Sequence, residues 1–267
     1  MRRAAAICSL MLGLAIGCAS GSRSGRGAAP VTRLKILTYN IHHAEGTDGE
    51  LDVERIARVI RGADPDLVAL QEVDDRAQRT GQVRQAAELG RLTGLIPTFA
   101  QAMSFQGGGY GQSILCKWPV QTRTIYTLPQ RAGREPRIAA LISTRVGGSG
   151  PELLFVSTHL DHEMEAVRKE QAQRLNAILT TNQAPIILCG DFNAGPESGT
   201  MQVFSADWVD AASAAPQPTI PAPTPTRRID YILLRPHQSW RLIETKVLEE
   251  PLASDHRPVL AVVELLP

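Results

Sequence analysis

The sequence predicts an α/β fold in which two β-sheets pack face to face and helices cover the outside. Short apolar segments recur from Leu34 to the C-terminus, and the strand-like segments outnumber the helical ones. The helical segments fall between strands rather than in one block. Sheets with an apolar face must bury that face, so this alternation favours layers of sheet and helix. At 267 residues, one large domain of this class is the better interpretation than two small ones.

The expected strands have an apolar face or an apolar core and end at polar or turn-forming residues. They cover residues 34–41, 63–73, 98–103, 111–117, 121–128, 137–146, 153–161, 185–193, 227–234, 244–250 and 257–265. Helices are expected at 51–62, 82–92, 163–181 and 199–205, where apolar residues recur with helical spacing. A Pro-rich loop at 216–225 could mark a domain boundary, but the segment after it is too short for a second domain.

The N-terminus has the pattern of an export signal. Arg2 and Arg3 precede a short apolar run, which is typical of a signal peptide over residues 1–17 and too short for a comfortable membrane span. The run ends at Cys18 in a sequence that resembles a bacterial lipobox, which implies a lipid on this cysteine and a membrane-anchored, extracytoplasmic lipoprotein. Ordinary cleavage, giving a secreted or periplasmic protein, is the alternative. Residues 18–33 read as a flexible tether.

Charge and cysteine content narrow the function classes. The chain has 28 basic and 27 acidic residues, and removing the five arginines before residue 34 leaves a mildly acidic domain. A protein that coats nucleic acid would carry an excess of basic residues, so we expect no stable complex with nucleic acid. The protein is expected to be a monomer. Cys116 and Cys189 lie in apolar runs and are expected to be buried free thiols, with a disulfide between them as the alternative.

Polar residues that could carry chemistry interrupt the apolar strands near their ends. Burying such groups is costly unless they are paired or bind a metal, so their repetition at strand ends predicts one shared site. They are Asn40, Glu72, His159, Asp191, Asn193, Asp230, Asp255 and His256. Carboxylate and amide oxygens suit Mg²⁺ or Mn²⁺, and two histidines without a nucleophilic Ser or Cys elbow indicate acid–base roles. Together they predict metal-assisted attack of water on a phosphate ester.

Six motifs carry a family resemblance. TYNIH, LQEV, STHL, GDFN, RIDYI and SDHRPV occur in this order and are similar to those of the endonuclease/exonuclease/phosphatase superfamily. The resemblance covers the chain from Leu34 to the C-terminus and implies a DNase-I-like four-layer α/β sandwich, with two mixed sheets flanked by helices. It also implies that residues 34–267 form a single catalytic domain.

The resemblance assigns roles position by position. Asn40, Glu72 and Asp255 would form the metal site. Asp191 and Asn193 would orient or deprotonate the attacking water and hold the phosphate. His256, held by Asp230, would contact the phosphate oxygens, and His159 would act as the second catalytic histidine.

For several other residues the sequence allows two roles each. Asn40 alone could cap a turn, and His43 could reach the site or only bond within its loop. Arg134 and Arg137 could grip a substrate phosphate or form surface ion pairs, and Arg79 is a weaker candidate of the same kind. The predicted substrate is a small or lipid-derived phosphodiester or phosphomonoester. The alternatives are an extracytoplasmic non-specific nuclease and a non-catalytic binding module on the same fold.

Overall fold

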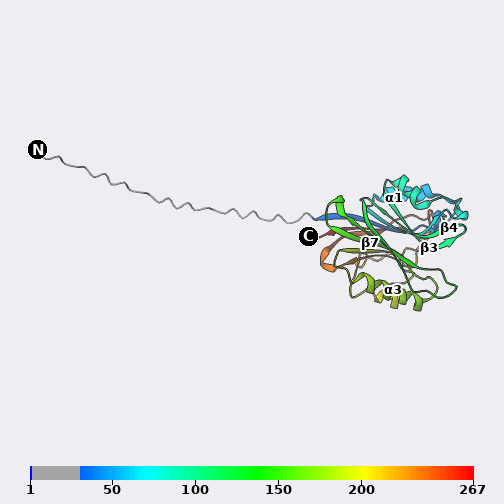
Figure 1. Cartoon of the computed structure of the whole chain (residues 1–267). Coiled ribbons are helices and arrows are strands. Elements are labelled where there is room, and N and C mark those ends of the chain that lie inside the picture. Colours follow the sequence, from blue (N-terminus) through cyan, green and yellow to red (C-terminus); the bar gives the residue numbers. More distant parts are fainter. Residues whose placement is uncertain (2–30) are drawn as a thin grey trace.

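A computed structural model describes Met1 and residues 31–267 of the chain (Figure 1). The predicted signal peptide, the lipidated Cys18 and nearly all of the predicted tether lie outside the described residues, so these stay predictions. In the described part of the chain, no helix has the length and apolar character needed to cross a membrane. Cys116 and Cys189 are both free and buried, as predicted.

Two six-stranded sheets form the centre of the fold. The first has the order β11-β12-β1-β2-β4-β3, and the second has the order β5-β6-β7-β8-β10-β9. Both are mixed, because β1–β2 and β7–β8 are parallel pairs and the other neighbours are antiparallel. The strands of the first sheet are β1 (Thr32–Asn40), β2 (Leu67–Asp75), β3 (Ile96–Phe105), β4 (Gly108–Cys116), β11 (Trp240–Val247) and β12 (Val259–Leu265). Those of the second are β5 (Val120–Thr127), β6 (Ile138–Arg145), β7 (Glu152–His159), β8 (Ile186–Asp191), β9 (Val209–Asp210) and β10 (Asp230–Arg235).

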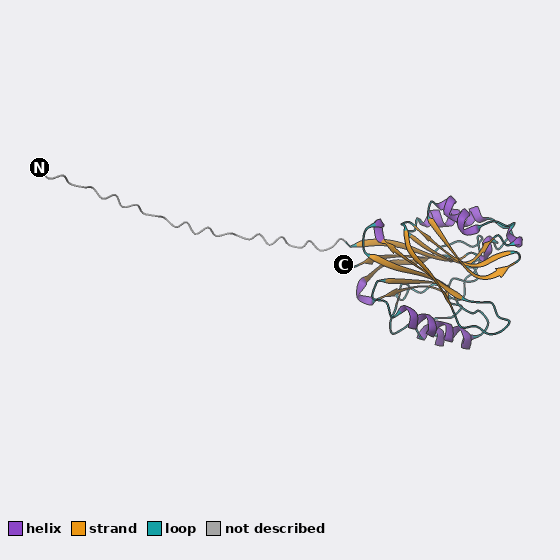
Figure 2. Ribbon diagram, viewed as in Figure 1, coloured by secondary structure: helices purple, strands orange, loops and turns teal. Residues whose placement is uncertain are grey.

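Helices cover the outer face of each sheet and complete the four layers (Figure 2). The helices α1 (Val53–Ala63) and α2 (Gln85–Thr93) pack on the first sheet, and α3 (Glu165–Leu179) and α4 (Gly199–Gln202) pack on the second. A separate apolar cluster between the sheets includes Ile36, Phe155 and Ile232. The predicted sandwich with outer helices is therefore confirmed. Four 3₁₀ turns complete the described structure: η1 (His42–Ala44), η2 (Gln78–Thr80), η3 (Val146–Gly148) and η4 (His237–Ser239).

Two strands at the edges of the sheets differ from the prediction. The two-residue strand β9 was not predicted, because so short a segment has no periodicity. Strand β11 begins at Trp240 rather than at residue 244 and ends at Val247. This edge strand is mostly exposed or half-buried and contains a bulge between Leu242 and Glu244, so its apolar residues do not follow a strict alternation.

The topology brings the polar strand ends to one edge of the sandwich. In parallel pairs the carboxyl ends point the same way, so Asn40 at the end of β1 lies beside Gln71 of β2, and His159 at the end of β7 pairs with Asp191 at the end of β8. Asp230, the first residue of the antiparallel β10, also pairs with Asp191. Both sheets thus present polar side chains at the same edge.

Candidate active site

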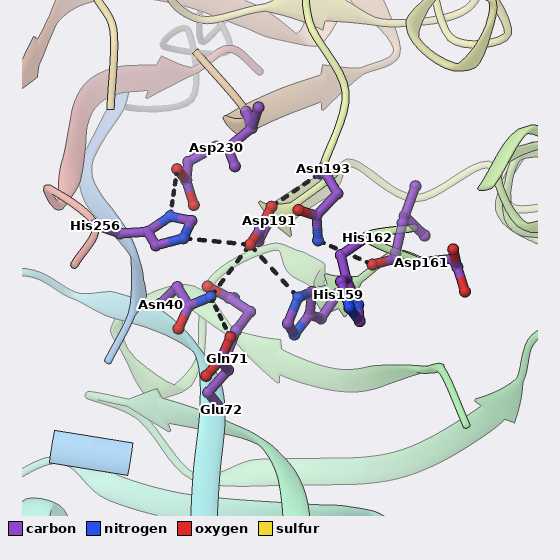
Figure 3. A network of polar contacts seen from close by, with 12 residues as sticks. Asn40, Gln71, Glu72, His159, Asp161, His162, Asp191, Asn193, Asp230 and His256 are labelled. Carbon is purple, nitrogen blue, oxygen red and sulfur yellow. Dashed lines mark hydrogen bonds and ion pairs between the residues drawn. The ribbon is translucent and has the colours of Figure 1, made fainter. Parts of the chain in front are cut away.

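A cleft of about 400 Å³ opens at this edge. Of the predicted catalytic and metal-binding residues, Glu72, His159, Asp191, Asn193, Asp255 and His256 line it. Asn40 and Asp230 lie directly behind them and contact Asp191 and His256 (Figure 3). The structure therefore brings together residues that are separated by more than two hundred positions in the chain.

Asp191 lies at the centre of the network. Its Oδ1 accepts a hydrogen bond from the backbone N–H of Asn193 at 2.8 Å, and its Oδ2 accepts one from Asn40 Nδ2 at 3.1 Å. The preceding residue must be glycine, since a Cβ at Gly190 would lie 1.9 Å from the carbonyl oxygen of Thr158. This close approach of β8 to β7 sets the position of the carboxylate.

Two imidazoles face the same oxygen of Asp191. The Nε2 atoms of His159 and His256 lie 3.5 and 3.7 Å from Asp191 Oδ2 (Figure 3). Burial raises the pKa of Asp191 to about 7, while the charge of His256 opposes this rise. A carboxylate with a pKa near neutrality can both accept and release a proton under ordinary conditions.

His256 is held by a buried carboxylate. Its Nδ1 lies 2.9 Å from Asp230 Oδ2, and that oxygen also accepts a hydrogen bond from Thr219 Oγ1 at 2.6 Å. Burial works against protonation of His256, but the charges of Asp230 and Asp191 outweigh it and raise the pKa to about 10. The ring is therefore a cation at neutral pH, and Asp230 fixes its orientation with Nε2 toward the cleft.

His159 has the opposite character. Burial, reinforced by the positive charges of Arg137 and His256, lowers its pKa well below the ordinary range. The ring is neutral at pH 7 and still faces Asp191. The cleft therefore contains one charged and one neutral imidazole, on either side of the same carboxylate.

Asn40 caps the turn after β1, which is one of the two roles that the sequence left open. Its Oδ1 accepts a hydrogen bond from the backbone N–H of His42 at 3.1 Å, which caps the turn after β1. Its Nδ2 also donates to Glu72 Oε1 at 2.9 Å. The amide thus links the turn to Glu72 and to Asp191 at once.

Glu72 has a strained backbone. The register between β2 and β4 shifts between Gln71 and Val73, and Glu72 at this bulge has a φ of 58°. A residue with a Cβ in the left-handed region costs about 1–2 kcal/mol. The bulge directs the carboxylate into the cleft, and no sequence pattern indicates this strain.

This strain predicts a difference in stability between two variants that both lack the carboxylate. We expect Glu72→Gly to be more stable than Glu72→Ala by about 1 kcal/mol, because glycine adopts a positive φ without steric cost. Urea unfolding of both variants in the presence of a chelator would measure this. Equal free energies of unfolding would show that the bulge at position 72 is relaxed.

Two groups of described residues have ligand atoms close enough to hold a metal ion, all within 4.8 Å of one another. One consists of Asp191, Asp230 and His256, and the other of His42, His43 and Glu72. The first group is buried and is consistent with a metal site. Asp255 lines the cleft beside His256 and adds another carboxylate.

Arg137 lines the cleft, and its predicted contact with a substrate phosphate stays a prediction. It is buried, donates from Nη1 to Glu135 Oε1 at 2.8 Å, and donates from Nη2 to His162 Nδ1 at 3.0 Å. Arg79 also lines the cleft, where it is paired with Asp74 at 2.8 and 2.9 Å.

Some cleft residues had no signal in the sequence. They are Met103, Phe105, Tyr110, Glu135, His162 and Ile220. Burial raises the pKa of Glu135, while Arg137 opposes the rise. Phe105 and Tyr110 come from the β3–β4 hairpin, and the Arg79 guanidinium lies 4.6 and 5.5 Å from their ring centroids. The cleft residues without a sequence signal come from β3, from β4 and from the loops before β6, after β7 and before β10, so tertiary packing and not a motif brings them to the site.

Two of the tentative substrate-binding residues are not on the cleft wall. Arg134 forms an ion pair with Glu163 and does not line the cleft, in agreement with the alternative of a surface ion pair. His43 is buried in the turn η1, where its Nε2 lies 3.3 Å from Glu45 Oε2, which is the loop-bond reading. The sequence could not separate Arg134 from Arg137, because both lie in the loop before β6, where no strand or helix periodicity indicates which side chain points inward.

Comparison with known proteins finds solved structures of the same fold. Solved structures similar to this chain include an endonuclease/exonuclease/phosphatase from Beutenbergia cavernae, with 25% identity, a TM-score of 0.71, and 87% of this chain and 72% of that chain covered. A family protein from Bacteroides thetaiotaomicron has 20% identity and a TM-score of 0.75, over 89% and 99% of the two chains. A mannosyl-6-phosphatase from the same organism has 20% identity and a TM-score of 0.72, over 86% and 99%.

A search of curated proteins found no match. The sequence profile of the endonuclease/exonuclease/phosphatase family matches residues 37–256, which include every predicted catalytic and metal-binding residue. Members of this family are metal-dependent phosphoesterases. The chain belongs to the endonuclease/exonuclease/phosphatase family.

Proposed function

We propose that this protein hydrolyses a small phosphoester by metal-assisted attack of water. The observation that carries the proposal is the surrounding of Asp191 Oδ2, where Asn40 Nδ2 and the Nε2 atoms of His159 and His256 all lie within 3.7 Å. A potential base, a cationic donor and a neutral donor thus converge on one point of the cleft, which is what phosphoryl transfer to water requires.

Asn40, Glu72 and Asp255 would hold Mg²⁺ or Mn²⁺. Glu72 and Asp255 line the cleft and supply the carboxylates that a hard cation prefers, and Asn40 Nδ2 holds Glu72 Oε1 at 2.9 Å. The strained bulge that turns Glu72 inward supports the same assignment. When bound, the metal would supply positive charge for the phosphate oxygens in the transition state.

Asp191 is suited to take a proton from the attacking water. Its pKa of about 7 leaves the carboxylate available at neutral pH without making it too weak a base. The N–H of Asn193 holds Oδ1, so Oδ2 is the oxygen that faces the cleft and the two histidines. Asn193 Nδ2 donates to the carbonyl oxygen of Leu160 at 3.1 Å and fixes the loop after β8.

The two histidines are suited to different parts of the phosphate. His256 keeps its proton and its charge because of Asp230, so it would stabilise the negative charge that develops on the phosphate oxygens. His159 is neutral and would donate a hydrogen bond without adding charge. We assign it to the region of the leaving group, on the other side of Asp191.

The arginines that line the cleft favour a small substrate over a nucleic-acid strand. Arg79 is neutralised by Asp74 and Arg137 is paired with Glu135, so the cleft has no unpaired row of basic residues to follow a phosphate backbone. One of the similar structures is that of a mannosyl-6-phosphatase, which supports a small phosphomonoester as the substrate. Another similar structure is that of zebrafish TDP2 in complex with a single-stranded DNA product, so the nuclease alternative is also tested below.

A phosphoester panel tests the proposal. Purified protein would be assayed with Mg²⁺ and with Mn²⁺ on aryl phosphate monoesters and diesters, sugar phosphates, sphingomyelin, RNA and plasmid DNA. We expect metal-dependent turnover, highest on a small or lipid-derived ester, and its loss in Glu72→Gln. The exposed Glu152→Gln is the matched control. Absence of turnover on every substrate would overturn the proposal, and a clear preference for plasmid DNA would favour the nuclease.

We propose that Arg137, which lines the cleft, contacts the substrate, and Arg137→Lys tests this contact. Lysine keeps the charge but loses the planar fork, so one charged hydrogen bond to the substrate, about 1.5 kcal/mol, is lost and KM should rise about tenfold. We expect kcat to change less than KM. Arg131→Lys is the control, because Arg131 pairs with Glu170 on the surface and does not line the cleft. An unchanged KM would assign Arg137 a structural role only.

A further inference from the structure

Two histidines next to the cleft have no part in the proposed chemistry. His42 and His43 form the turn after β1, and their ring centroids lie 4.5 Å apart. One ligand atom of each lies within 4.8 Å of the other and of the Glu72 carboxylate. His43 is buried and His42 is half-buried, so neither ring is freely exposed to solvent.

The backbone of this turn is strained in a way that brings the rings together. His42, His43 and Ala44 have φ values of 44°, 44° and 65°, three consecutive residues in the left-handed region without a glycine. A residue with a Cβ is strained in this region, so the surroundings must hold the conformation in place. Asn40 Oδ1 accepts the N–H of His42, and Gln85 Nε2 donates to the carbonyl of His43 at 2.6 Å. Strain stored at an active-site edge is a mark of function.

A single residue, Glu45, sets the proton positions of both rings. Its backbone carbonyl lies 3.2 Å from His42 Nδ1, and its carboxylate oxygen Oε2 lies 3.3 Å from His43 Nε2. Both oxygens accept hydrogen bonds, so each of these nitrogens carries the proton in a neutral ring. The lone pairs are therefore on His42 Nε2 and His43 Nδ1, and within the described residues His43 Nδ1 is buried with no hydrogen-bond partner.

We propose that His42, His43 and Glu72 bind a first-row transition-metal cation of the Co²⁺ or Zn²⁺ type, separate from the Mg²⁺ site that Glu72 would share. Imidazole nitrogens favour such cations, whereas Mg²⁺ favours oxygen. Metal-binding histidines usually donate their other N–H to a carbonyl or a carboxylate, as both do here to Glu45. A bound cation would also satisfy the buried lone pair of His43 Nδ1. The site does not depend on hydrolysis, although it has Glu72 in common with the proposed function.

Cobalt binding tests the site directly. Chelator-treated protein would be titrated with Co²⁺ in saturating Mg²⁺, with the visible absorption of the bound ion as the readout. We expect His42→Ala and His43→Ala each to weaken Co²⁺ binding by at least about 10- to 100-fold. Removing a residue that only hydrogen-bonds a metal ligand already has an effect of this size, and these variants remove a ligand itself. His237→Ala, on the distant turn η4, should bind Co²⁺ as the native chain does.

The outcomes separate this proposal from the proposed function. Wild-type Co²⁺ affinity in folded His42→Ala and His43→Ala would overturn the histidine site, whatever the turnover of the protein. Should the buried His43→Ala fail to fold, the half-buried His42→Ala decides alone. Loss of Co²⁺ binding in these variants supports the site even where no phosphoester is hydrolysed.

Discussion

Replacing Asp191 by asparagine is expected to lower turnover by about 10²- to 10⁴-fold while the fold is kept. Asparagine has nearly the same shape, and its Oδ1 can still accept the N–H of Asn193, which now bonds the carboxylate at 2.8 Å. What is lost is the basic oxygen that faces His159 and His256. Turnover of a small phosphoester with Mg²⁺, together with a thermal melt, measures both parts of the prediction.

Asp207→Asn is a suitable control for this experiment. Asp207 accepts a hydrogen bond from Asn176 Nδ2 at 3.2 Å beyond α4 and does not line the cleft. We expect its turnover to match that of the native chain. Turnover near the native value in Asp191→Asn would exclude Asp191 as the base, and unfolding of that variant would show that the carboxylate is needed for structure as well.

The strand ends could be predicted from the sequence because they follow a simple rule. An apolar run that stops at Asn40, His159 or Asp191 places a polar side chain at the edge of a sheet. Gly190 next to Asp191 was also readable as part of a motif, although its physical reason, the carbonyl of Thr158 at 1.9 Å from a Cβ, needs the structure. The order of the motifs and the predicted architecture agree with the fold.

What could not be predicted depends on contacts between distant elements. The strain at Glu72 arises from a bulge between β2 and β4, and nothing local in LQEV indicates it. Glu135 and Phe105 reach the cleft from loops and edge strands of different sheets. Arg134 and Arg137 are close in sequence but differ in environment: the Arg134 side chain pairs with Glu163 at the surface, and the Arg137 side chain is buried. Sequence periodicity alone does not resolve such a difference.

Replacing Asp230 by asparagine is expected to reduce turnover by about 10²- to 10⁴-fold through His256. Asp230 Oδ2 holds His256 Nδ1 at 2.9 Å, and its charge is the largest of those that raise the pKa of the imidazole. Without that charge the pKa falls from about 10 toward the ordinary value. The amide can also present its NH₂ group to Nδ1 and favour the wrong tautomer.

The pH dependence separates this role from a merely structural one. The imidazolium is present below the pKa, so activity that requires it is lost as the pH rises through that value. The alkaline limb of the kcat profile should therefore move to lower pH in Asp230→Asn. Asp210→Asn, whose carboxylate binds Arg228 away from the cleft, should leave the limb in place. An unshifted limb in Asp230→Asn would exclude His256 as the titrating group.

Stability should change in the same direction. A group whose pKa is higher in the folded chain than in the unfolded chain contributes its full stabilisation below the unfolded pKa, near 6.5 for histidine, and loses it as pH rises through the folded value. For His256 this window extends from about 6.5 to about 10. The native chain should therefore lose free energy of unfolding across this range, and Asp230→Asn should lose less of it. Because the assay needs no substrate and no metal, it tests the Asp230–His256 pair independently of turnover.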